Sequence, residues 1–366
     1  MRFELAVSSD EAALRRLLRE SPMEGEIKLT LEREPCIDLA HGIEGDRTVV
    51  LVGRSGLDED PVAMGACSLL TSFVNGVPTS VVYLGQLRIH QNHRGRAGVL
   101  RRGYAALRDL AGSTGHARLF FTTIVADNVP ARRLFEAGLR GMPRYRPLGD
   151  VLSLTFSTRN RRNSTTRSEV SAAKAEDLAE IADCLGRYGA RFQFAPRWTP
   201  TDLVSPKRAR GLHPEDFIVV RSGSRIVGCL ACWDQREFKQ IVVRGYSSRL
   251  SLLRPVWNVV APLVAAPGLP APGSSLPVAF LSHLAIDNDD AEVFEALLGA
   301  GLARAASRGA EYAILGLAEL NPLTAAALRW RPRSYRSRAY LVYWPEGESA
   351  ADRVDARTLH LEMAIL

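Results

Sequence analysis

The chain has 366 residues, which is too long for one ordinary hydrophobic core and suits two domains of roughly 150 to 200 residues each. With 46% hydrophobic and 24% charged residues, its composition is that of a soluble globular protein. The formal net charge of +7, from 47 Lys and Arg against 40 Asp and Glu, favours an anionic ligand, either a phosphorylated cofactor or nucleic acid.

The cysteines and the apolar runs give no sign of secretion or of a membrane protein. Five cysteines are scattered along the chain, so no disulfide framework is implied. Cys229 and Cys232 form a CxxC inside an apolar run, and without a second pair we expect packing there rather than a metal or redox site. The N-terminus has no signal-peptide apolar region, and no stretch approaches the roughly 18 apolar residues of a membrane span. We therefore expect no membrane span, no metal and a cytoplasmic location.

A polar linker divides the chain into two comparable parts. Residues 157–168, STRNRRNSTTRS, contain almost nothing that could be buried. We call residues 1–156 the first half, residues 169–348 the second half, and residues 349–366 the C-terminal tail. The landmarks of the two halves recur in the same order, which predicts an internal repeat.

The predicted elements follow one order in both halves. Each half opens with a short strand and a helix, within residues 3–20 and 169–185, and continues with two β-branched runs that predict an antiparallel strand pair. An apolar strand, VVYLGQLRI at 81–89 or VAFLSHLAI at 278–286, then leads into a long helix. A strand, a short helix and a last strand complete each half. The order β-α-β-β-β-α-β-α-β predicts a duplicated α/β fold.

The second half carries an insertion near residues 240–275. Its first part has apolar residues at helical spacing, and its end is rich in Pro and Gly. This segment could cover a cleft, dock on the other half or touch a membrane. We favour an internal cover.

Two segments of the first half carry a family pattern. LGQLRIHQNHRGRAGVL, at 84–100, joins an apolar strand to a turn of small residues and arginines at a helix start, and ADNVPARRLFEAGLRG, at 126–141, has Asn, Ala and apolar residues at fixed spacing. Together they resemble the GNAT superfamily of acyl-CoA N-acyltransferases, although Ala97 and Val99 stand where that family favours Gly. The resemblance covers the first half well and the second by topology. It implies two tandem GNAT-like domains, each a central mixed, mostly antiparallel sheet flanked by helices.

The turn at the helix start suits the pyrophosphate of coenzyme A. Amides at the N-terminus of a helix beginning near Arg96 would point at the anion, which small side chains let the backbone approach. A strand-to-helix turn with a solvated basic rim is the alternative. The resemblance implies acetyl-CoA or another acyl-CoA as cosubstrate, held by Leu87, Arg88, Ile89, Arg94, Gly95, Arg96, Ala97, Gly98, Val99, Asn128 and Ala131. Asn128 would bond the cofactor arm, cap the following helix, or both.

The usual proton-transfer groups of the family are missing from the first half. Many GNAT enzymes have Glu where this chain has Gln86, which cannot take a proton, so we assign Gln86 an orienting role. The common tyrosine of the family falls on Phe135. His90, His93, Tyr145 or a water could handle protons instead, or the second half could supply His283, which aligns with Gln86 and could equally be structural.

The second half lacks the features of a pyrophosphate turn. Asp287, Asp289, Asp290 and Glu292 stand where the phosphates would lie, and these carboxylates would repel them. We therefore expect the first half to bind acyl-CoA and the protein to transfer an acetyl group to a primary amine of a small molecule or peptide by direct attack. A non-catalytic acyl-CoA sensor or scaffold is the alternative. No nucleic-acid partner is expected, and the oligomeric state is left open.

Overall fold

The computed structural model describes the chain except residues 24, 57–58, 96, 115–118, 160–167 and 265–267, with backbone alone at 97, 111–114, 262 and 264. The elements of the first half are β1 (Arg2–Leu5), α1 (Glu11–Arg19), β2 (Ile27–Glu32), α2 (Ile37–Glu44), β3 (Arg47–Arg54), β4 (Ala63–Val74), β5 (Val77–Ile89), α3 (Ala97–Thr114), β6 (Phe120–Val125), α4 (Val129–Glu136) and β7 (Arg144–Ser157).

The second half and the C-terminal tail add the remaining elements. They are β8 (Val170–Ala172), α5 (Leu178–Gly189), β9 (Phe217–Ser222), β10 (Arg225–Trp233), β11 (Gln240–Tyr246), α6 (Ser248–Val260), η6 (Ala261–Val264), β12 (Val278–Ile286), α7 (Ala291–Ser307), β13 (Tyr312–Ala318), α8 (Thr324–Leu328), β14 (Arg333–Tyr343), α9 (Glu348–Asp352) and η9 (Met363–Ile365), the η elements being short 3₁₀ turns. None of the helices in the part of the chain that the structure describes is long and apolar enough to cross a bilayer.

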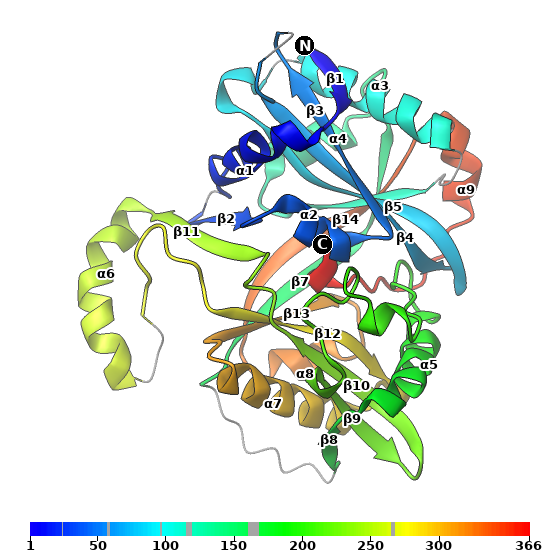
Figure 1. Cartoon of the computed structure of the whole chain (residues 1–366), viewed down its shortest axis with the longest axis vertical. Helices are drawn as coiled ribbons and strands as arrows, with labels where there is room; N and C mark the ends of the chain where they lie inside the picture. The colour runs from blue at the N-terminus through cyan, green and yellow to red at the C-terminus, as the bar shows by residue number, and fades with distance from the viewer. Residues whose placement is uncertain (24, 57–58, 96, 115–118, 160–167, 265–267) are drawn as a thin grey trace.

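One mixed sheet of twelve strands runs through the molecule (Figure 1), in the order β1-β3-β4-β5-β6-β14-β7-β13-β12-β10-β9-β8. Two pairings are parallel, β5 with β6 and β12 with β13, and the others are antiparallel. Helices flank the sheet, as the sequence predicts. The predicted fold class, a mixed and mostly antiparallel sheet with flanking helices, is confirmed.

The last strands of the two halves exchange partners. β14 of the second half lies between β6 and β7, with Tyr340 opposite Thr122 on one side and opposite Pro147 on the other. β7 of the first half in turn pairs with β13, with Leu154 opposite Leu315. The sheets of the two halves are therefore continuous, and each half is completed by a strand from the other.

The insertion docks on the first half. β11 pairs with β2 in a separate two-stranded sheet, with Val243 opposite Leu29, and α6 follows on the outside of the molecule (Figure 1). Gln240 exchanges two side-chain hydrogen bonds of 3.0 Å with the backbone of Glu34 beyond β2. The internal cover that we favoured from the sequence is therefore wrong, because the edge of β2 binds the insertion and α6 points away from the body.

The strand exchange predicts that the halves do not fold independently. Alone, residues 1–156 lack β14, so the edges of β6 and β7 lose their hydrogen-bonding partner. We expect this fragment to be insoluble or molten when expressed alone, and to form a stable one-to-one complex when co-expressed with residues 169–366. Circular dichroism and size-exclusion chromatography measure both outcomes.

The matched control is the full chain with a protease site inserted between residues 160 and 167. After cleavage, the two pieces should still co-elute under native conditions and separate in denaturant. A soluble, cooperatively unfolding fragment 1–156 would contradict the prediction.

Candidate functional site

A bulge interrupts β5 close to its end. Ala66 pairs with Gly85 and Met64 with Arg88, so Gln86 and Leu87 together face the single residue between those partners on β4. Gln86 has a φ of 53°, a left-handed conformation that is uncommon for a residue with a side chain. The bulge turns the strand's backbone out of the regular ladder at this point.

The bulge lies where β5 and β6 diverge. Their parallel pairing consists of Val82 with Phe120 and Tyr83 with Phe121, and the described residues of the two strands form no ladder pair beyond these. A backbone amide released by a bulge beside such an opening is available to a bound ligand. The structure thus gives the first half the opening between strands that the family resemblance implies.

The side chain of Gln86 is fixed by two residues of α2. Its Nε2 donates to both carboxylate oxygens of Glu44, at 2.9 and 3.0 Å, and its Oε1 lies 3.4 Å from Nε2 of His41. Glu44 is buried and forms an ion pair of 3.2 Å with Arg33, which is also buried. These contacts fix the orientation of the Gln86 amide. Its nitrogen donates to Glu44, and its oxygen, Oε1, points away from Glu44 and can accept a hydrogen bond.

Glu44 and His41 were not singled out by sequence reasoning. They lie more than 40 positions before Gln86, so no local spacing links them to it. A weak signal is their place in α2, where a His and a Glu stand among apolar residues of a short helix that is mostly buried. A buried carboxylate without a local partner requires one from elsewhere in the fold.

Charge from the second half reaches the same cluster. Lys239 is buried, and its Nζ donates to backbone oxygens of Ala364 at 2.9 Å and Leu366 at 2.8 Å. Burial, with the nearby Arg33 adding to it, lowers the pKa of Lys239 to about 7, while Glu44 acts in the opposite direction. The insertion and the C-terminal tail therefore border the site of the first half.

The turn between β5 and α3 has the predicted shape at its described positions. Arg94 donates from Nε to the carbonyl of Ile89 at 3.0 Å, and Gly95 has a φ of 77°, which favours glycine. A side chain placed at Gly98 would meet Arg102 at 3.5 Å, an ordinary contact. α3 begins at Ala97, so the free amides of its first turn lie directly after the turn. Arg96 lies outside the described residues.

The remaining predicted residues of this region lie near the same end of β5. Leu87 is exposed, and Arg88 donates to the Leu87 carbonyl at 3.0 Å. His90 accepts from the amide of Asn92 at 3.4 Å and lines a surface pocket with residues of α1. Val99 is buried in the first turn of α3. The structure brings the β5 end and the turn together, as a cofactor site along this edge requires.

Asn128 caps α4. Its Oδ1 accepts from the amide of Ala131 at 3.2 Å, and the side chain is exposed at the rim of the sheet. The structure thus shows that Asn128 caps the helix through Oδ1. The amide nitrogen of the same side chain, Nδ2, takes no part in the cap.

Tyr145 belongs to an aromatic cluster behind α4. Its ring stacks on Phe135 at 4.7 Å, and its hydroxyl contacts that of Tyr104. Burial is the main cause that raises the pKa of Tyr145 well above its usual value, and the pKa of Tyr104 rises to about 12. Tyr145 is therefore held in its neutral form, which can donate a proton and cannot serve as a base at neutral pH.

The second half repeats the bulge with different surroundings. Cys229 pairs with Ala285 and Ala231 with Ser282, which leaves His283 in the bulge with a φ of 53°, as at Gln86. The backbone geometry therefore supports the alignment of His283 with Gln86 that the sequence predicts.

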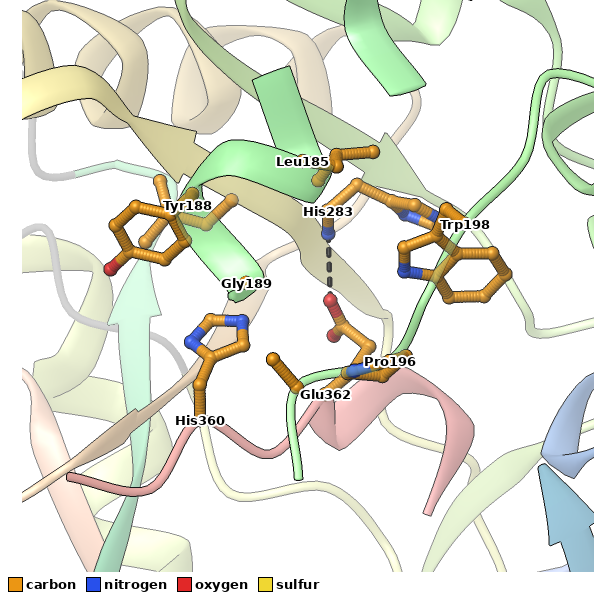
Figure 2. Close-up of a pocket in the computed structure, with 10 residues that line it drawn as sticks. Leu185, Tyr188, Gly189, Pro196, Trp198, His283, His360 and Glu362 are labelled. Atoms are coloured by element: carbon orange, nitrogen blue, oxygen red, sulfur yellow. Dashed lines mark hydrogen bonds between the residues drawn. The ribbon is translucent and has the colours of Figure 1, made fainter. Parts of the chain in front are cut away.

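His283 is surrounded by the rings of Trp198, Phe217 and Trp233, of which Figure 2 shows Trp198. Its ring lies 4.4 Å from that of Trp198, and its Nδ1 is 2.9 Å from Oγ of Ser282. Burial lowers the pKa of His283 to about 3. This environment favours the structural role over the role of a base, because the ring does not take up a proton near neutral pH.

The C-terminal tail fills the corresponding opening of the second half. Its η9 turn contacts both β12 and β13, and Gly316 lies directly against Met363. Oε2 of Glu362 accepts from the backbone amide of His283 at 2.7 Å (Figure 2). Burial raises the pKa of Glu362 to about 7. The bulge amide of the second half is thus occupied by a carboxylate of the chain itself.

The acidic turn before α7 is used for structure. Asp290 caps α7 by accepting from the amides of Glu292 at 2.8 Å and Val293 at 3.3 Å, while Asp287 pairs with Arg187 at 3.3 Å. This turn presents carboxylates where the first half has glycine and arginine. In the part of the chain that the structure describes, no group of three or more His, Cys, Asp or Glu is arranged to hold a metal ion.

Comparison with known proteins agrees with this geometry. Residues 12–139 match the acetyltransferase (GNAT) family. N-myristoyltransferase from Saccharomyces cerevisiae, solved with bound myristoyl-CoA, is similar over 93% of this chain and 82% of its own, with a TM-score of 0.57 and 11% identity. A GCN5-related N-acetyltransferase from Sphaerobacter thermophilus is similar over 93% of this chain and 94% of its own, with a TM-score of 0.54 and 13% identity. Among curated protein sequences, none matches the chain significantly.

These similarities confirm the family resemblance drawn from residues 84–141. At 11% and 13% identity the two solved structures show a shared fold, and they show it for nearly the whole chain rather than for the first half alone. The family match supports acyl-CoA-dependent acyl transfer in general.

His360 of the tail gives a pH-dependent prediction. Its buried ring packs against Tyr188 and Phe192, and burial lowers its pKa to about 4, against about 6.5 in an unfolded chain. Between about pH 6.5 and pH 4, His360 therefore binds a proton in the unfolded chain and not in the folded protein. Stability from this group is complete above about pH 6.5 and is lost as the pH falls towards 4, with a loss of about 2 kcal/mol at pH 5.

Urea denaturation of the wild type and of His360→Phe at pH 7.5 and pH 5.0 tests this. The variant should lose about 2 kcal/mol less than the wild type between the two pH values, since Phe keeps the ring contacts and has no proton to bind. Glu362 contributes with the opposite sign in both proteins and cancels in the comparison. Equal losses in the two proteins would contradict the prediction.

Proposed function

We propose that the protein is an acyl-CoA-dependent N-acyltransferase, because residues 12–139 match the acetyltransferase (GNAT) family. The first half binds acetyl-CoA or another acyl-CoA, and the acyl group passes to a primary amine of a small molecule or peptide by direct attack. The observation that supports the proposal is that a bulge at Gln86 and a glycine-containing turn leading into α3 lie at the same end of β5. All five cysteines are free thiols, which supports a reducing, cytoplasmic setting.

The cofactor would lie along the end of β5. We propose that its pyrophosphate binds the first-turn amides of α3, where the helix dipole and Arg94 favour an anion. The backbone of Leu87 and Ile89 would hold the pantetheine arm in the opening between β5 and β6. The free Nδ2 of Asn128, which the helix cap does not use, is available to the same arm.

The bulge would stabilise the negative charge that develops on the thioester oxygen. The second half supports this, because there the amide of His283 at the equivalent bulge donates to a carboxylate oxygen of Glu362 at 2.7 Å. A backbone of this shape can therefore present an N–H group to an oxyanion. We propose the same use of the bulge amides around Gln86, with no reorganisation during the reaction.

The amine would be oriented by Gln86. Because Nε2 of Gln86 donates to Glu44, its Oε1 is directed to accept an N–H of the incoming amine. In the reaction the amine nitrogen bonds to the carbonyl carbon, the C–S bond breaks, and the coenzyme leaves as a thiol or thiolate. The amine proton passes to a water molecule or to the carboxylate of Glu44 beside Gln86.

A non-catalytic acyl-CoA sensor or scaffold is the second candidate. It is favoured by two particular residues, Gln86 and Phe135, which replace the groups that commonly transfer protons in this family. Release of coenzyme A thiol across a panel of amines and acyl-CoA chain lengths separates the two functions. Acyl-CoA binding without thiol release on any amine would favour the sensor.

Gly98 allows a test of the pyrophosphate turn. A Cβ at this position makes only an ordinary contact with Arg102, so Gly98→Glu adds a negative charge beside the first-turn amides without a backbone clash. We expect the dissociation constant of acetyl-CoA, measured by calorimetry, to rise at least tenfold, which corresponds to about 1.4 kcal/mol.

Gly98→Ala is the matched control, since it adds the Cβ without the charge. It should bind acetyl-CoA within a few-fold of the wild type. If Gly98→Glu and Gly98→Ala bound acetyl-CoA with equal affinity, the turn would not be part of the cofactor site.

Gln86 allows a test of the orienting role. Gln86→Gly removes the side chain, and because glycine adopts the positive φ of the bulge without strain, this relief offsets part of the stability lost with the two hydrogen bonds to Glu44. We expect kcat to fall roughly tenfold or more, because one oriented hydrogen bond to the amine is lost, while the KM for acyl-CoA stays the same.

The comparison variant is Gln86→Asn, which keeps a shorter amide and also tolerates a positive φ. Its kcat should lie between those of the wild type and the glycine variant. An unchanged kcat in Gln86→Gly, measured on a folded protein that still binds acyl-CoA, would rule out the orienting role.

A further inference from the structure

The helix of the insertion exposes an unusual apolar surface. α6 and η6 project from the body of the molecule on the two-stranded sheet of β11 and β2 (Figure 1). None of the thirteen residues of α6, all of which the structure describes, is buried. Seven large apolar side chains are exposed on this segment, which we call the α6 surface: Leu252, Leu253, Val256, Trp257, Val259, Val260 and Leu263.

The helix turns its polar side towards its own chain. Arg254 donates from Nε to the carbonyl of Leu269 at 2.9 Å. Asn258 donates to the same carbonyl at 3.0 Å and accepts from the amide of Leu269 at 2.7 Å. These hydrogen bonds fix the rotation of α6, and the apolar side faces outward as a consequence. This arrangement is the reverse of that expected for a surface helix of a monomer.

The outermost apolar residues have the spacing of a helix–helix seam. Leu252, Val256, Val259 and Leu263 follow one another at intervals of four, three and four positions. Three of them are largely exposed, with 80% for Leu252, 75% for Val259 and 83% for Leu263. Intervals of three and four are those of the two core positions of a heptad, which pack against an equivalent row on another helix.

We propose that the α6 surface is a dimer interface, in which α6 of one chain packs antiparallel against α6 of a second copy about a two-fold axis. The same residues then face one another in both copies, as a closed isologous contact requires. Arg249, exposed in the first turn of α6, comes beside the C-terminal end of the partner helix, where the helix dipole places partial negative charge. A parallel pair would instead bring two Arg249 side chains together.

The charge of the helix argues for a second copy over a lipid surface. Helices that bind anionic membranes carry several Lys or Arg on their polar side. In α6 the polar side holds Arg254 and Asn258, which are hydrogen-bonded to the chain, and Arg249 is the exposed basic residue among the described positions of the helix. Glu26, whose carbonyl accepts from Ser247 at 2.8 Å, adds an exposed acidic residue at the base of the helix.

The small area of the α6–α6 interface predicts a weak dimer. A helix of thirteen residues is roughly 20 Å long, and a pair of such helices buries less than the standard interface of about 1,600 Å². The dimer should therefore dissociate on dilution, and its population should follow protein concentration.

Sedimentation velocity of the full-length protein across a wide concentration range measures this. We expect the wild type to shift from monomer to dimer with rising concentration, and Leu252→Glu/Val259→Glu to remain a monomer at the highest concentration. Leu320→Glu, at an equally exposed apolar residue after β13, is the matched control and should dimerise as the wild type does. Circular dichroism confirms that each variant is folded, which is expected because the substituted side chains are exposed.

Cysteine cross-linking tests the antiparallel geometry. In an antiparallel pair Val256, near the middle of the seam, meets its own copy, whereas the two Arg249 positions lie at opposite ends. Val256→Cys should form a disulfide-linked dimer on mild oxidation, and Arg249→Cys should not. Cross-linking of both would replace the antiparallel arrangement with a parallel one.

Other results would overturn the dimer. They include a wild type that stays monomeric at all concentrations, and a dimer that the double substitution leaves intact. A monomer that co-sediments with phosphatidylserine-containing vesicles, and loses this on Leu252→Glu/Val259→Glu, would identify a lipid surface as the occupant instead.

Discussion

The position of β14 between β6 and β7 is the interaction on which the rest of the molecule depends. It joins the sheets of two halves into one, because β14 pairs with both strands along most of its length. It also brings Trp344, directly after the strand, into the aromatic cluster behind α4, where the indole lies 5.1 Å from the ring of Phe120. The first half thus owes part of its core to residues more than 200 positions later in the chain. The two repeated units therefore share one sheet.

The two bulges show how one backbone geometry can have two outcomes. At Gln86 and at His283 the strand adopts the same positive φ beside an opening between parallel strands. In the second half the opening is filled by the tail, and the carboxylate of Glu362 takes the bulge amide. In the first half the bulge is bordered by a polar cluster of Gln86, Glu44 and Arg33, and a glycine-containing turn follows it. The equivalent amide is bound by the chain itself in the second half, and in the first half it belongs to the cofactor site that we propose.

The fold was predictable from the sequence further than the site. Most of the order of elements and the alignment of Gln86 with His283 follow from apolar periodicity and from the repeat, which are local signals, whereas β2 and α2 were not predicted. Periodicity does not say which strand lies beside which, so the exchange of β7 and β14 had to come from the structure. The role of Glu44 was not predicted for a similar reason, because Glu44 and Gln86 are distant in the sequence and meet only in the folded protein. The docking of β11 on β2 was also not predicted, because nothing in the sequence of an edge strand identifies the strand that pairs with it.

The second half also contributes charge to the site. Lys239 is buried beside the tail, and its pKa is lowered by this burial and by the charge of Arg33 and raised by that of Glu44. A buried Arg33–Glu44 pair is costly to desolvate, so it is maintained only where further hydrogen bonds satisfy it, as Gln86 does for Glu44. The carboxylate of Glu44 in turn fixes the amide of Gln86. The second half therefore borders the candidate site of the first half through the backbone of the tail and the amino group of Lys239.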